Sequence, residues 1–374
     1  MVPPLGSGAG SGYLRLLAAL VRVRRAGEVV VRDDGAVVAE ITHEVDLCLP
    51  SGALNPAAVG WTRTPLHRAN LRTGDPLGRA STWARTKRWD SWSVQTPEHC
   101  VVLQLSSLNY AALHEVWVLD RATGVQLGST ATVPLARDVR LPSRYGGGPA
   151  RGQSGSFAVA FDPVAEGMRL RAVAPRLRLN LVVEEVRERE SLGVVVPWSD
   201  RLFQYSLRQV ALPVRGRMWL DEREITVERD DPSWAVAGFG RGRWPYSVEW
   251  ISAVGSGLVD GVTTGLQLGG RWTDGTGTTE NAVVLDGRVH RINEDLSWAY
   301  DAADRGATWF VTGDRVQVQL RPFHVRSATT KLGVLSTTTY QSFGTWTGWV
   351  VDDAGERRRV DGLVGWAEDV TSRW

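Results

Sequence analysis

Short segments in which apolar and polar residues alternate, separated by turns, run through most of the chain. In residues 156–188, arginines such as Arg169 and Arg171 alternate with leucines such as Leu170. A period of two is that of a β-strand with one buried face. Turn pairs such as Asp286-Gly287 separate these segments at intervals of about 8–12 residues. The pattern therefore predicts an all-β protein built from antiparallel sandwiches or barrels.

The length of 374 residues exceeds that of one ordinary β-barrel, so we expect two. A weak internal sequence repeat supports this expectation, since Val116–Asp120 is similar to Ala282–Asp286. We place a boundary near Arg189. The predicted parts are an N-terminal tail (1–26), a first barrel (27–189) and a second barrel (190–374). Helical periodicity is convincing only at Tyr13–Arg25, within that tail, whose Gly/Ser-rich start is typical of disorder.

The charge pattern excludes several classes of protein. The formal net charge is +2, and basic residues alternate with acidic ones, as in RERES (187–191). Such a solvated surface lacks the basic stripe of a nucleic-acid-binding protein. The longest apolar run near the N-terminus, Leu16–Val21, is too short to span a bilayer, and no signal peptide is evident. We therefore expect a cytoplasmic protein without an integral membrane segment.

No cofactor or metal motif is present. The six histidines lack metal-binding spacing. GFGRGRW (238–244) lacks the βαβ context of a dinucleotide site, and GGRWTDGTGTTEN (269–281) lacks the lysine of a phosphate-binding loop. We therefore expect no cofactor and no metal. Cys48 and Cys100 could form one disulfide, but two reduced, buried thiols are favoured.

The stretch 238–292 combines several tryptophans with acidic residues, arginines and glycines. The chain has 17 tryptophans, and this stretch holds Trp244, Trp250 and Trp272 beside the carboxylates Asp274 and Glu280. An apolar tryptophan wall raises the pKa of a nearby carboxyl group, which suits a general acid. We therefore name Glu280 and Asp274 as candidate catalytic residues. In the alternative reading, Asp274 forms a turn and Glu280 pairs with a neighbouring arginine.

Further polar and aromatic residues are candidates for ligand binding. Asn281 adjoins Glu280 on a predicted strand, so it is either part of a buried network or a ligand contact. Arg63, Arg88, Arg241 and Arg243 each neighbour a tryptophan, which indicates cation–π stacking or a clamp for an anionic lipid. The candidate ligand-binding residues are Arg241, Arg243, Trp244, Trp272, Asn281, Trp89 and Trp61.

Seven tryptophan-studded motifs carry a resemblance to a known family. They are LNPAAVGWTR (54–63), KRWDSW (87–92), VVVPWSDRLFQYS (194–206), GRGRWPYSVEW (240–250), GLQLGGRWTDGTGTTENAVVLDGRVHRI (265–292), QSFGTWTG (341–348) and GLVGWAED (362–369). On these residues the chain resembles the DUF2804 family of bacterial proteins, while WARTK (83–87) departs from the family's pattern. The family has no established activity, so it implies no catalytic residues. Its distant similarity to double-calycin proteins, which include carotenoid hydratases, implies two lipocalin-like barrels packed together.

These observations favour a protein that binds an apolar small molecule, lipid or isoprenoid-like, at a barrel mouth or between barrels. The sequence leaves open whether it is an enzyme. If it is, we expect a cofactor-free hydratase or isomerase with Glu280 or Asp274 as the acid. The alternatives are a non-catalytic two-barrel carrier or scaffold, and a carbohydrate-binding protein with exposed, coplanar tryptophan platforms.

Overall fold

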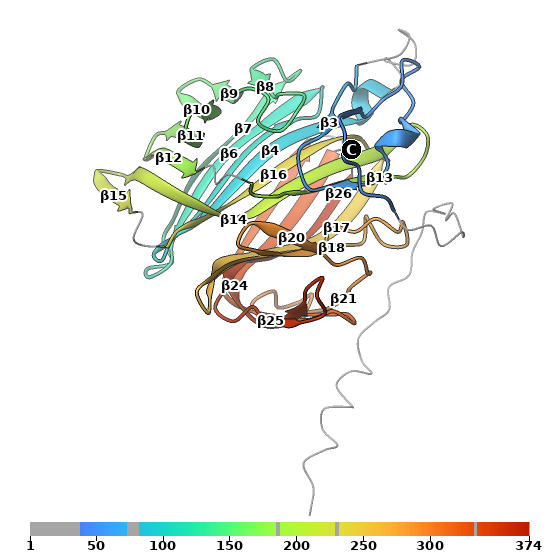
Figure 1. Ribbon diagram of the computed structural model, residues 1–374. Coiled ribbons are helices and arrows are strands. Elements are labelled where there is room, and N and C mark those ends of the chain that lie inside the picture. Colours follow the sequence, from blue (N-terminus) through green and yellow to red (C-terminus); the bar gives the residue numbers. More distant parts are fainter. Residues whose placement is uncertain (1–37, 73–81, 185–187, 229–231, 333–334, 374) are drawn as a thin grey trace, which may run out of the picture. The chain divides into compact units, whose positions relative to one another are not determined.

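The described residues form an all-β structure, as the alternating pattern predicts (Figure 1). The computed structural model describes residues 38–72, 82–184, 188–228, 232–332 and 335–373. Within these ranges the only helical elements are two short 3-10 turns, η2 (Pro56–Ala58) and η3 (Trp83–Arg85). The helix expected at 13–25 and the hairpin turn expected at Asp34-Gly35 lie outside the described residues.

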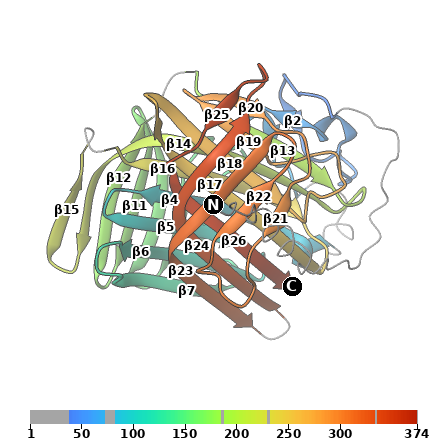
Figure 2. The ribbon, with the colours of Figure 1, turned by 90° about the horizontal axis from the view of Figure 1, so that it is seen from below.

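Two large antiparallel sheets, here sheet 1 and sheet 2, contain most of the strands, and both are seen from below in Figure 2. A separate parallel pair joins β1 (Val45–Asp46) to β3 (His67–Arg68). Sheet 1 has the strand order β7-β6-β5-β4-β16-β14-β12-β11-β10-β9-β8, with β13, β15 and β2 paired beside it. Its strands are β2 (Trp61–Thr62), β4 (Thr86–Gln95), β5 (His99–Ser107), β6 (Ala111–Asp120), β7 (Gln126–Pro134), β8 (Val139–Arg140), β9 (Ala150–Ser154), β10 (Phe157–Val164), β11 (Gly167–Ala174), β12 (Leu177–Glu184), β13 (Leu192–Pro197), β14 (Phe203–Leu220), β15 (Arg223–Val227) and β16 (Trp234–Arg243).

Sheet 2 has the order β20-β19-β18-β17-β26-β24-β23-β22-β21, with β25 paired to β24. Its strands are β17 (Ser247–Val259), β18 (Val262–Gly270), β19 (Ala282–Leu285), β20 (Arg288–Arg291), β21 (Ser297–Ala299), β22 (Trp309–Thr312), β23 (Val316–Leu332), β24 (Leu335–Val351), β25 (Arg357–Arg359) and β26 (Val364–Arg373). The expected Asp286-Gly287 turn joins β19 to β20. Both residues have a positive φ, 46° and 85°, which is the backbone that an Asp-Gly hairpin turn requires.

The change from one sheet to the other falls between β16 and β17, after Arg243 and before Ser247. Strands β13 to β16 therefore belong to sheet 1, although they follow the boundary expected near Arg189. Strand β14 spans much of sheet 1, because it pairs with β13 and β16 in its first half and with β12 and β15 in its second. The division of the chain into two barrel domains stays a prediction.

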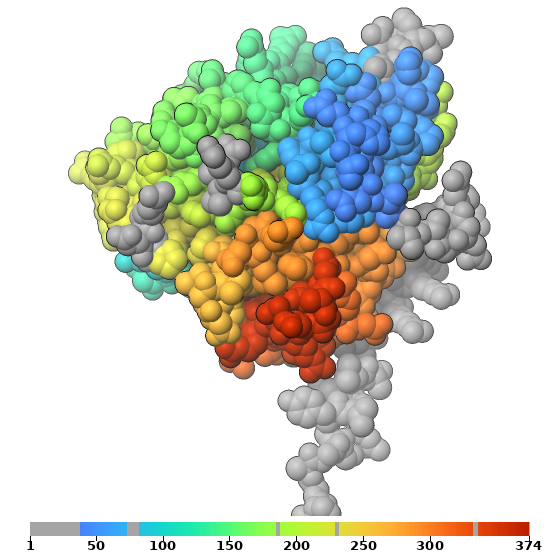
Figure 3. All heavy atoms as spheres, in the orientation of Figure 1, coloured from blue at the N-terminus to red at the C-terminus, as the bar shows by residue number. Residues whose placement is uncertain are grey.

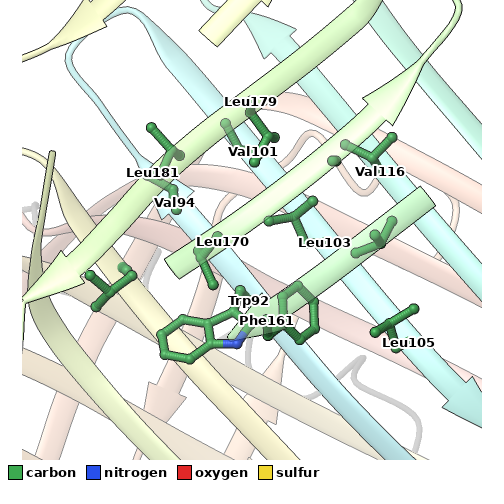
Figure 4. Packing of buried hydrophobic residues seen from close by; sticks show 14 of the residues in the cluster. Trp92, Val94, Val101, Leu103, Leu105, Val116, Phe161, Leu170, Leu179 and Leu181 are labelled. Atoms are coloured by element: carbon green, nitrogen blue, oxygen red, sulfur yellow. The ribbon is translucent and has the colours of Figure 1, made fainter. Parts of the chain in front are cut away.

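Each sheet packs one face on a core of its own. The core of sheet 1 lies between β4–β6 and β10–β12, where Trp92 meets Phe161 edge-on at a ring separation of 6.4 Å (Figure 4). The core of sheet 2 is built around the fully buried Trp309 and Trp346. Burying such rings is the main source of stability in a β-structure of this kind.

A third hydrophobic cluster joins the two sheets. It combines residues of sheet 1, such as Trp117 and Val210, with residues of sheet 2, such as Phe343 and Trp366. The rings of Trp117 and Phe343 stack at 5.2 Å. The described N-terminal segment, 38–72, packs on the opposite face of sheet 1 from these contacts, against Phe203 and Phe239, and is the blue layer in Figure 3. The two faces of sheet 1 thus have different neighbours.

Candidate functional site

The stretch 238–292 crosses from sheet 1 to sheet 2. It contains the end of β16, the link Trp244-Pro245-Tyr246 and the strands β17 to β20. The cores of both sheets are filled by side chains, so the residues of interest are those beside this crossing. There the structure gathers side chains from five separate places in the chain.

Five tryptophans, here called the tryptophan cluster, meet at this crossing: Trp89, Trp198, Trp244, Trp250 and Trp272. Trp244 is the centre, with ring separations of 5.4 Å to Trp89 and 5.5 Å to Trp250. Trp198 lies between Trp244 and Trp272, with ring separations of 6.3 Å to Trp244 and 6.1 Å to Trp272. Trp244 is buried and the other four rings are half-buried, so the cluster is reached from solvent.

The rings pack edge to face, with angles between 65° and 89°. This is the favoured geometry of aromatic pairs, because the positive edge of one ring meets the negative face of the next. One glycine is required for it, since a Cβ at Gly240 would lie 2.0 Å from Trp89 Cζ2. Sugar-binding sites of the kind considered above need coplanar platforms, which this cluster does not offer.

Three of the five indole N–H groups bind polar side chains inside the site. Trp272 Nε1 donates to Glu280 Oε2 at 3.0 Å, and Trp250 Nε1 donates to Glu368 Oε1 at 3.2 Å. Trp244 Nε1 donates to Gln204 Oε1 at 2.6 Å. The cluster thus presents two carboxyl groups beside a large aromatic surface.

The two carboxyl groups lie on the same face of sheet 2. Glu368 pairs in register with Ser252, whose hydroxyl donates to Glu368 Oε1 at 2.8 Å. Ser252 pairs in turn with Gly269, and a Cβ at Gly269 would come within 2.9 Å of Glu280 Oε2. Glu280, which is 3% exposed, therefore covers the bare backbone of Gly269, one strand away from Ser252.

Burial of its carboxyl group raises the pKa of Glu368. The nearby Glu280 acts in the same direction, because two close negative charges repel. The guanidinium of Arg208 and the hydrogen bonds from Ser252 and Trp250 oppose the rise. The outcome is a carboxyl group that keeps its proton to a higher pH than an exposed glutamate, which is a property of general acids.

The other two polar candidates of this stretch, Asp274 and Asn281, bind backbone groups and not the indoles of the cluster. Asp274 is exposed in a turn, where its Oδ1 accepts a hydrogen bond from the backbone N–H of Arg271 at 2.7 Å. Asn281 is fully buried and satisfied: Oδ1 accepts from Gly269 N at 2.7 Å, and Nδ2 donates to the carbonyl of Glu294 at 2.8 Å. Asn281 thus holds the loop 271–280 in place, in agreement with the buried-network alternative.

Arg241 and Arg243 point to the face of sheet 1 that packs on segment 38–72. Arg241 Nη2 donates to Asp90 Oδ1 at 2.6 Å and to the Pro142 carbonyl at 2.8 Å. Arg243 donates to the carbonyls of Gly52 and Leu71. Burial raises the pKa of Asp90 and lowers that of Arg241, although their mutual attraction opposes both shifts. These arginines fasten loops to the sheet and lie on the other face from the tryptophan cluster.

Trp61 lies in the cluster between the sheets, where the guanidinium carbons of Arg63 and Arg291 sit 5.0 and 5.1 Å from its ring centre. This agrees with the cation–π reading of Arg63. Of the sequence-derived candidates, the structure brings together the side chains of Trp89, Trp244, Trp272 and Glu280. The side chains of the other candidates, Trp61, Asp274, Asn281, Arg241 and Arg243, have different partners.

Besides Trp250 and Ser252 of the stretch 238–292 itself, three residues of the site are absent from the sequence-derived candidates: Trp198, Glu368 and Gln204. They come from the segments 194–206 and 362–369, far from the stretch 238–292. Both segments belong to the tryptophan-studded motifs, which is the signal that could have pointed to them. The proximity of Glu368 to Glu280 depends on the pairing of β26 with β17 and cannot be inferred from spacing.

Other described features bear on the remaining expectations. Among the described residues, no group of three His, Cys, Asp or Glu side chains is arranged to hold a metal ion. No helix in the described ranges is long and apolar enough to cross a membrane. Cys48 and Cys100 are buried in different hydrophobic clusters, and no disulfide joins them. The cytoplasmic location stays a prediction.

The family that the motifs resemble is confirmed by a match over most of the chain. The model of a domain of unknown function, DUF2804, matches residues 38–374. The chain belongs to the DUF2804 family. No curated protein matches this DUF2804 chain.

Solved structures with a similar course of the chain include CghA in complex with Sch210972 and kievitone hydratase from Nectria haematococca. CghA is 12% identical, with a TM-score of 0.48 and coverage of 77% of this chain and 88% of CghA. Kievitone hydratase is 9% identical, with a TM-score of 0.45 and the same coverage of 77% and 88%.

Proposed function

We propose that this DUF2804 protein binds an apolar small molecule against the tryptophan cluster and uses Glu368 and Glu280 for cofactor-free acid–base chemistry on it. The observation that carries the proposal is a pair of carboxyl groups, of the buried Glu280 and the half-buried Glu368, that each accept an indole N–H from the same half-buried cluster. Apolar surface with a few convergent polar groups is the usual composition of a small-molecule site.

The chemistry that this arrangement supports is hydration or isomerisation of a carbon–carbon double bond. In a hydration, Glu368 gives its proton to one alkene carbon. Water forms a bond to the other carbon, and its proton passes to Glu280. The product gains one water, and the proton on Glu280 returns to Glu368 through solvent. Glu368 is assigned as the acid because its pKa is raised by burial. Asp274, which is exposed in a turn, takes no part in this proposal.

The test starts from the purified protein. Native mass spectrometry, followed by extraction and identification of any retained molecule, is expected to yield an apolar, unsaturated compound. Incubation of that compound with the protein is expected to give a product 18 Da heavier, or an isomer, as fixed by the mass of water. Glu368→Gln keeps the acceptor for Trp250 and Ser252 but removes the acid, so it should bind the compound and fail to convert it.

A matched variant separates the site from the other face of sheet 1. Arg243→Lys lies on that other face and should leave turnover unchanged, since Arg243 contacts the Gly52 and Leu71 carbonyls. Full turnover by Glu368→Gln would reject the catalytic role. Retention of an unaltered compound by both proteins would support the alternative, a carrier without catalysis. One observation favours that alternative: side chains fill the cores of both sheets, as expected of a structural scaffold.

A further inference from the structure

Two arginines between the sheets, Arg208 and Arg291, have buried donors without a hydrogen-bond partner among the described residues, and Arg208 is the one beside the proposed acid. The Nη1 atom of Arg208, on β14, is buried and makes no hydrogen bond there. Arg63 and Arg241 differ, because Arg63 binds Glu190 at 3.0 Å and Arg241 binds Asp90 at 2.6 Å. Arg88 and Arg243 each keep an unpaired, buried Nε but donate hydrogen bonds through their other nitrogens. Buried guanidinium donors are normally paired. The unpaired donor of Arg208 is therefore available to a group that binds there from outside the chain.

Arg208 lies beside the proposed acid. Its guanidinium carbon is 5.7 Å from the centre of the Trp366 ring, and Glu368 follows Trp366 on the same face of β26. The guanidinium acts electrostatically on the carboxyl group of Glu368. The neighbour of Arg208 on β16 is Gly238, which has no side chain to cover it. The free donor, the acid and the tryptophan cluster therefore belong to one region.

The charges of this region limit what the donor can bind. The carboxyl group of Glu368 interacts electrostatically with the guanidinium of Arg208 and with the carboxyl group of Glu280. Arg326, another arginine between the sheets, already pairs with Glu115. An anionic headgroup at Arg208 would add a further negative charge beside these two carboxyl groups. Such like charges repel one another strongly where water is largely excluded. A neutral acceptor oxygen adds no charge and still satisfies the Arg208 donor.

We propose that Arg208 binds the carbonyl oxygen of the apolar ligand, so that the substrate class is a hydrophobic α,β-unsaturated ketone or ester. This inference rests on the proposed function, since it takes the tryptophan cluster as the binding surface. A charged donor on the carbonyl draws electrons from the conjugated double bond. Water then forms a bond to the β-carbon and loses a proton to Glu280, while Glu368 protonates the α-carbon, so that one water is added in all.

The test uses three probes that share one ring system: 2-acetonaphthone, with a carbonyl group; 2-ethylnaphthalene, its apolar counterpart; and 2-naphthoate, an anion. Dissociation constants are measured by equilibrium dialysis for the full chain and for Arg208→Met. The unmodified protein should bind 2-acetonaphthone about tenfold or more tightly than 2-ethylnaphthalene, the effect of one hydrogen bond to a charged group. Arg208→Met should lose that preference and keep its affinity for 2-ethylnaphthalene.

Two further variants serve as controls. Arg178→Met removes an arginine whose guanidinium carbon also sits over an indole, 4.7 Å from the Trp219 ring, but on the exposed side of β12. It should keep the full preference for 2-acetonaphthone. Arg208→Lys keeps a charged donor and should retain part of the preference, which separates the loss of the donor from a change of shape.

Each outcome decides one point. Equal affinity of the unmodified protein for 2-acetonaphthone and 2-ethylnaphthalene, or an unchanged preference in Arg208→Met, overturns the role of Arg208 and leaves the proposed function standing. Tightest binding of 2-naphthoate, lost in Arg208→Met, replaces the carbonyl ligand by an anion and overturns the substrate class. Failure of all three probes to bind contradicts the proposed function itself.

Discussion

The guanidinium of Arg208 on sheet 1 lies over the ring of Trp366 on sheet 2 at 5.7 Å, yet its buried Nη1 lacks a hydrogen-bond partner among the described residues. Arg63 is a useful contrast, because it lies over Trp61 at 5.0 Å and also pairs with Glu190 and Glu40. One arginine thus has the partners expected of a structural residue, and the other does not.

This difference predicts opposite effects on stability. Replacing Arg208 by Met removes an unsatisfied buried donor, so we expect the free energy of unfolding to rise by about 1 kcal/mol. Arg63→Met leaves Glu190 without its cation, and we expect a fall of about 1 kcal/mol. Urea denaturation followed by circular dichroism gives both values. A loss of stability in Arg208→Met equal to that in Arg63→Met would make Arg208 a structural residue.

The raised pKa of Glu368 predicts a pH-dependent difference between the protein and Glu368→Gln. A carboxyl group with a higher pKa in the folded state binds its proton more tightly there, so its contribution to stability is complete below the unfolded value, about 4.3. That contribution is lost as the pH rises through the folded pKa, by about 1.4 kcal/mol for each unit between the two values.

Glu368→Gln should therefore gain stability relative to the unmodified protein as the pH rises from 4 to 8. Thermal denaturation at several pH values measures this gain. The comparison must be made between the two proteins, because other carboxyl groups have the opposite dependence. Asp162, for example, has a pKa lowered by Arg171 and Arg151 despite its burial. A difference that stays constant with pH would show that Glu368 titrates as an ordinary glutamate.

The tryptophan cluster depends on Gly240. A Cβ there would lie 2.0 Å from Trp89 Cζ2 and 2.4 Å from Cη2, so the rigid ring has to move. Gly240→Ala is expected to lower the free energy of unfolding by about 1–3 kcal/mol, the usual effect of overpacking, and to weaken 2-ethylnaphthalene binding. Gly306→Ala is the matched control, since the nearest atom to its Cβ is Asp304 Oδ1, at 3.1 Å. Unaltered probe binding in Gly240→Ala would remove Trp89 from the site.

The buried pair of Arg241 and Asp90 is expected to be structural. Asp90→Asn leaves a fully buried guanidinium without its counter-charge, and we expect a loss of about 3–5 kcal/mol in chemical denaturation. The exposed pair of Arg176 and Asp221 is the comparison, and Asp221→Asn should cost less than about 1 kcal/mol. Similar costs for the two substitutions would contradict the tight burial of Arg241.

Both cysteines are expected to be unreactive in the folded protein. Burial raises the pKa of Cys100 to about 12, so almost no thiolate is present at neutral pH. A chromogenic disulfide such as Ellman's reagent should release no colour from the native protein and should titrate two thiols after denaturation. Only one or no thiol after denaturation under non-reducing conditions would indicate that Cys48 and Cys100 had been oxidised.

Much of the fold follows from local rules. The alternation in residues 156–188 corresponds to the strands β10, β11 and β12, which pair as consecutive hairpins. The Asp286-Gly287 turn lies where its backbone preference puts it. The motifs rich in tryptophan indicated the family, whose model covers residues 38–374. Such features depend on neighbouring residues and on the buried face of each strand, and both are written in the sequence.

The site was decided only by tertiary structure. The sequence alone directed attention to Glu280 with its nearby tryptophans, and the indole of Trp272 does bind that carboxylate. The sequence could not show that Glu368 and Arg208 belong to the same site, because they lie 88 and 72 residues from Glu280. The pairing of β26 with β17 and the contact between the sheets bring them there. Nor could the sequence show that Arg241 and Arg243 face away from the cluster. Alternation along a strand shows which residues share a face. It does not show which of the two faces meets the other sheet, because the packing of the sheets decides that.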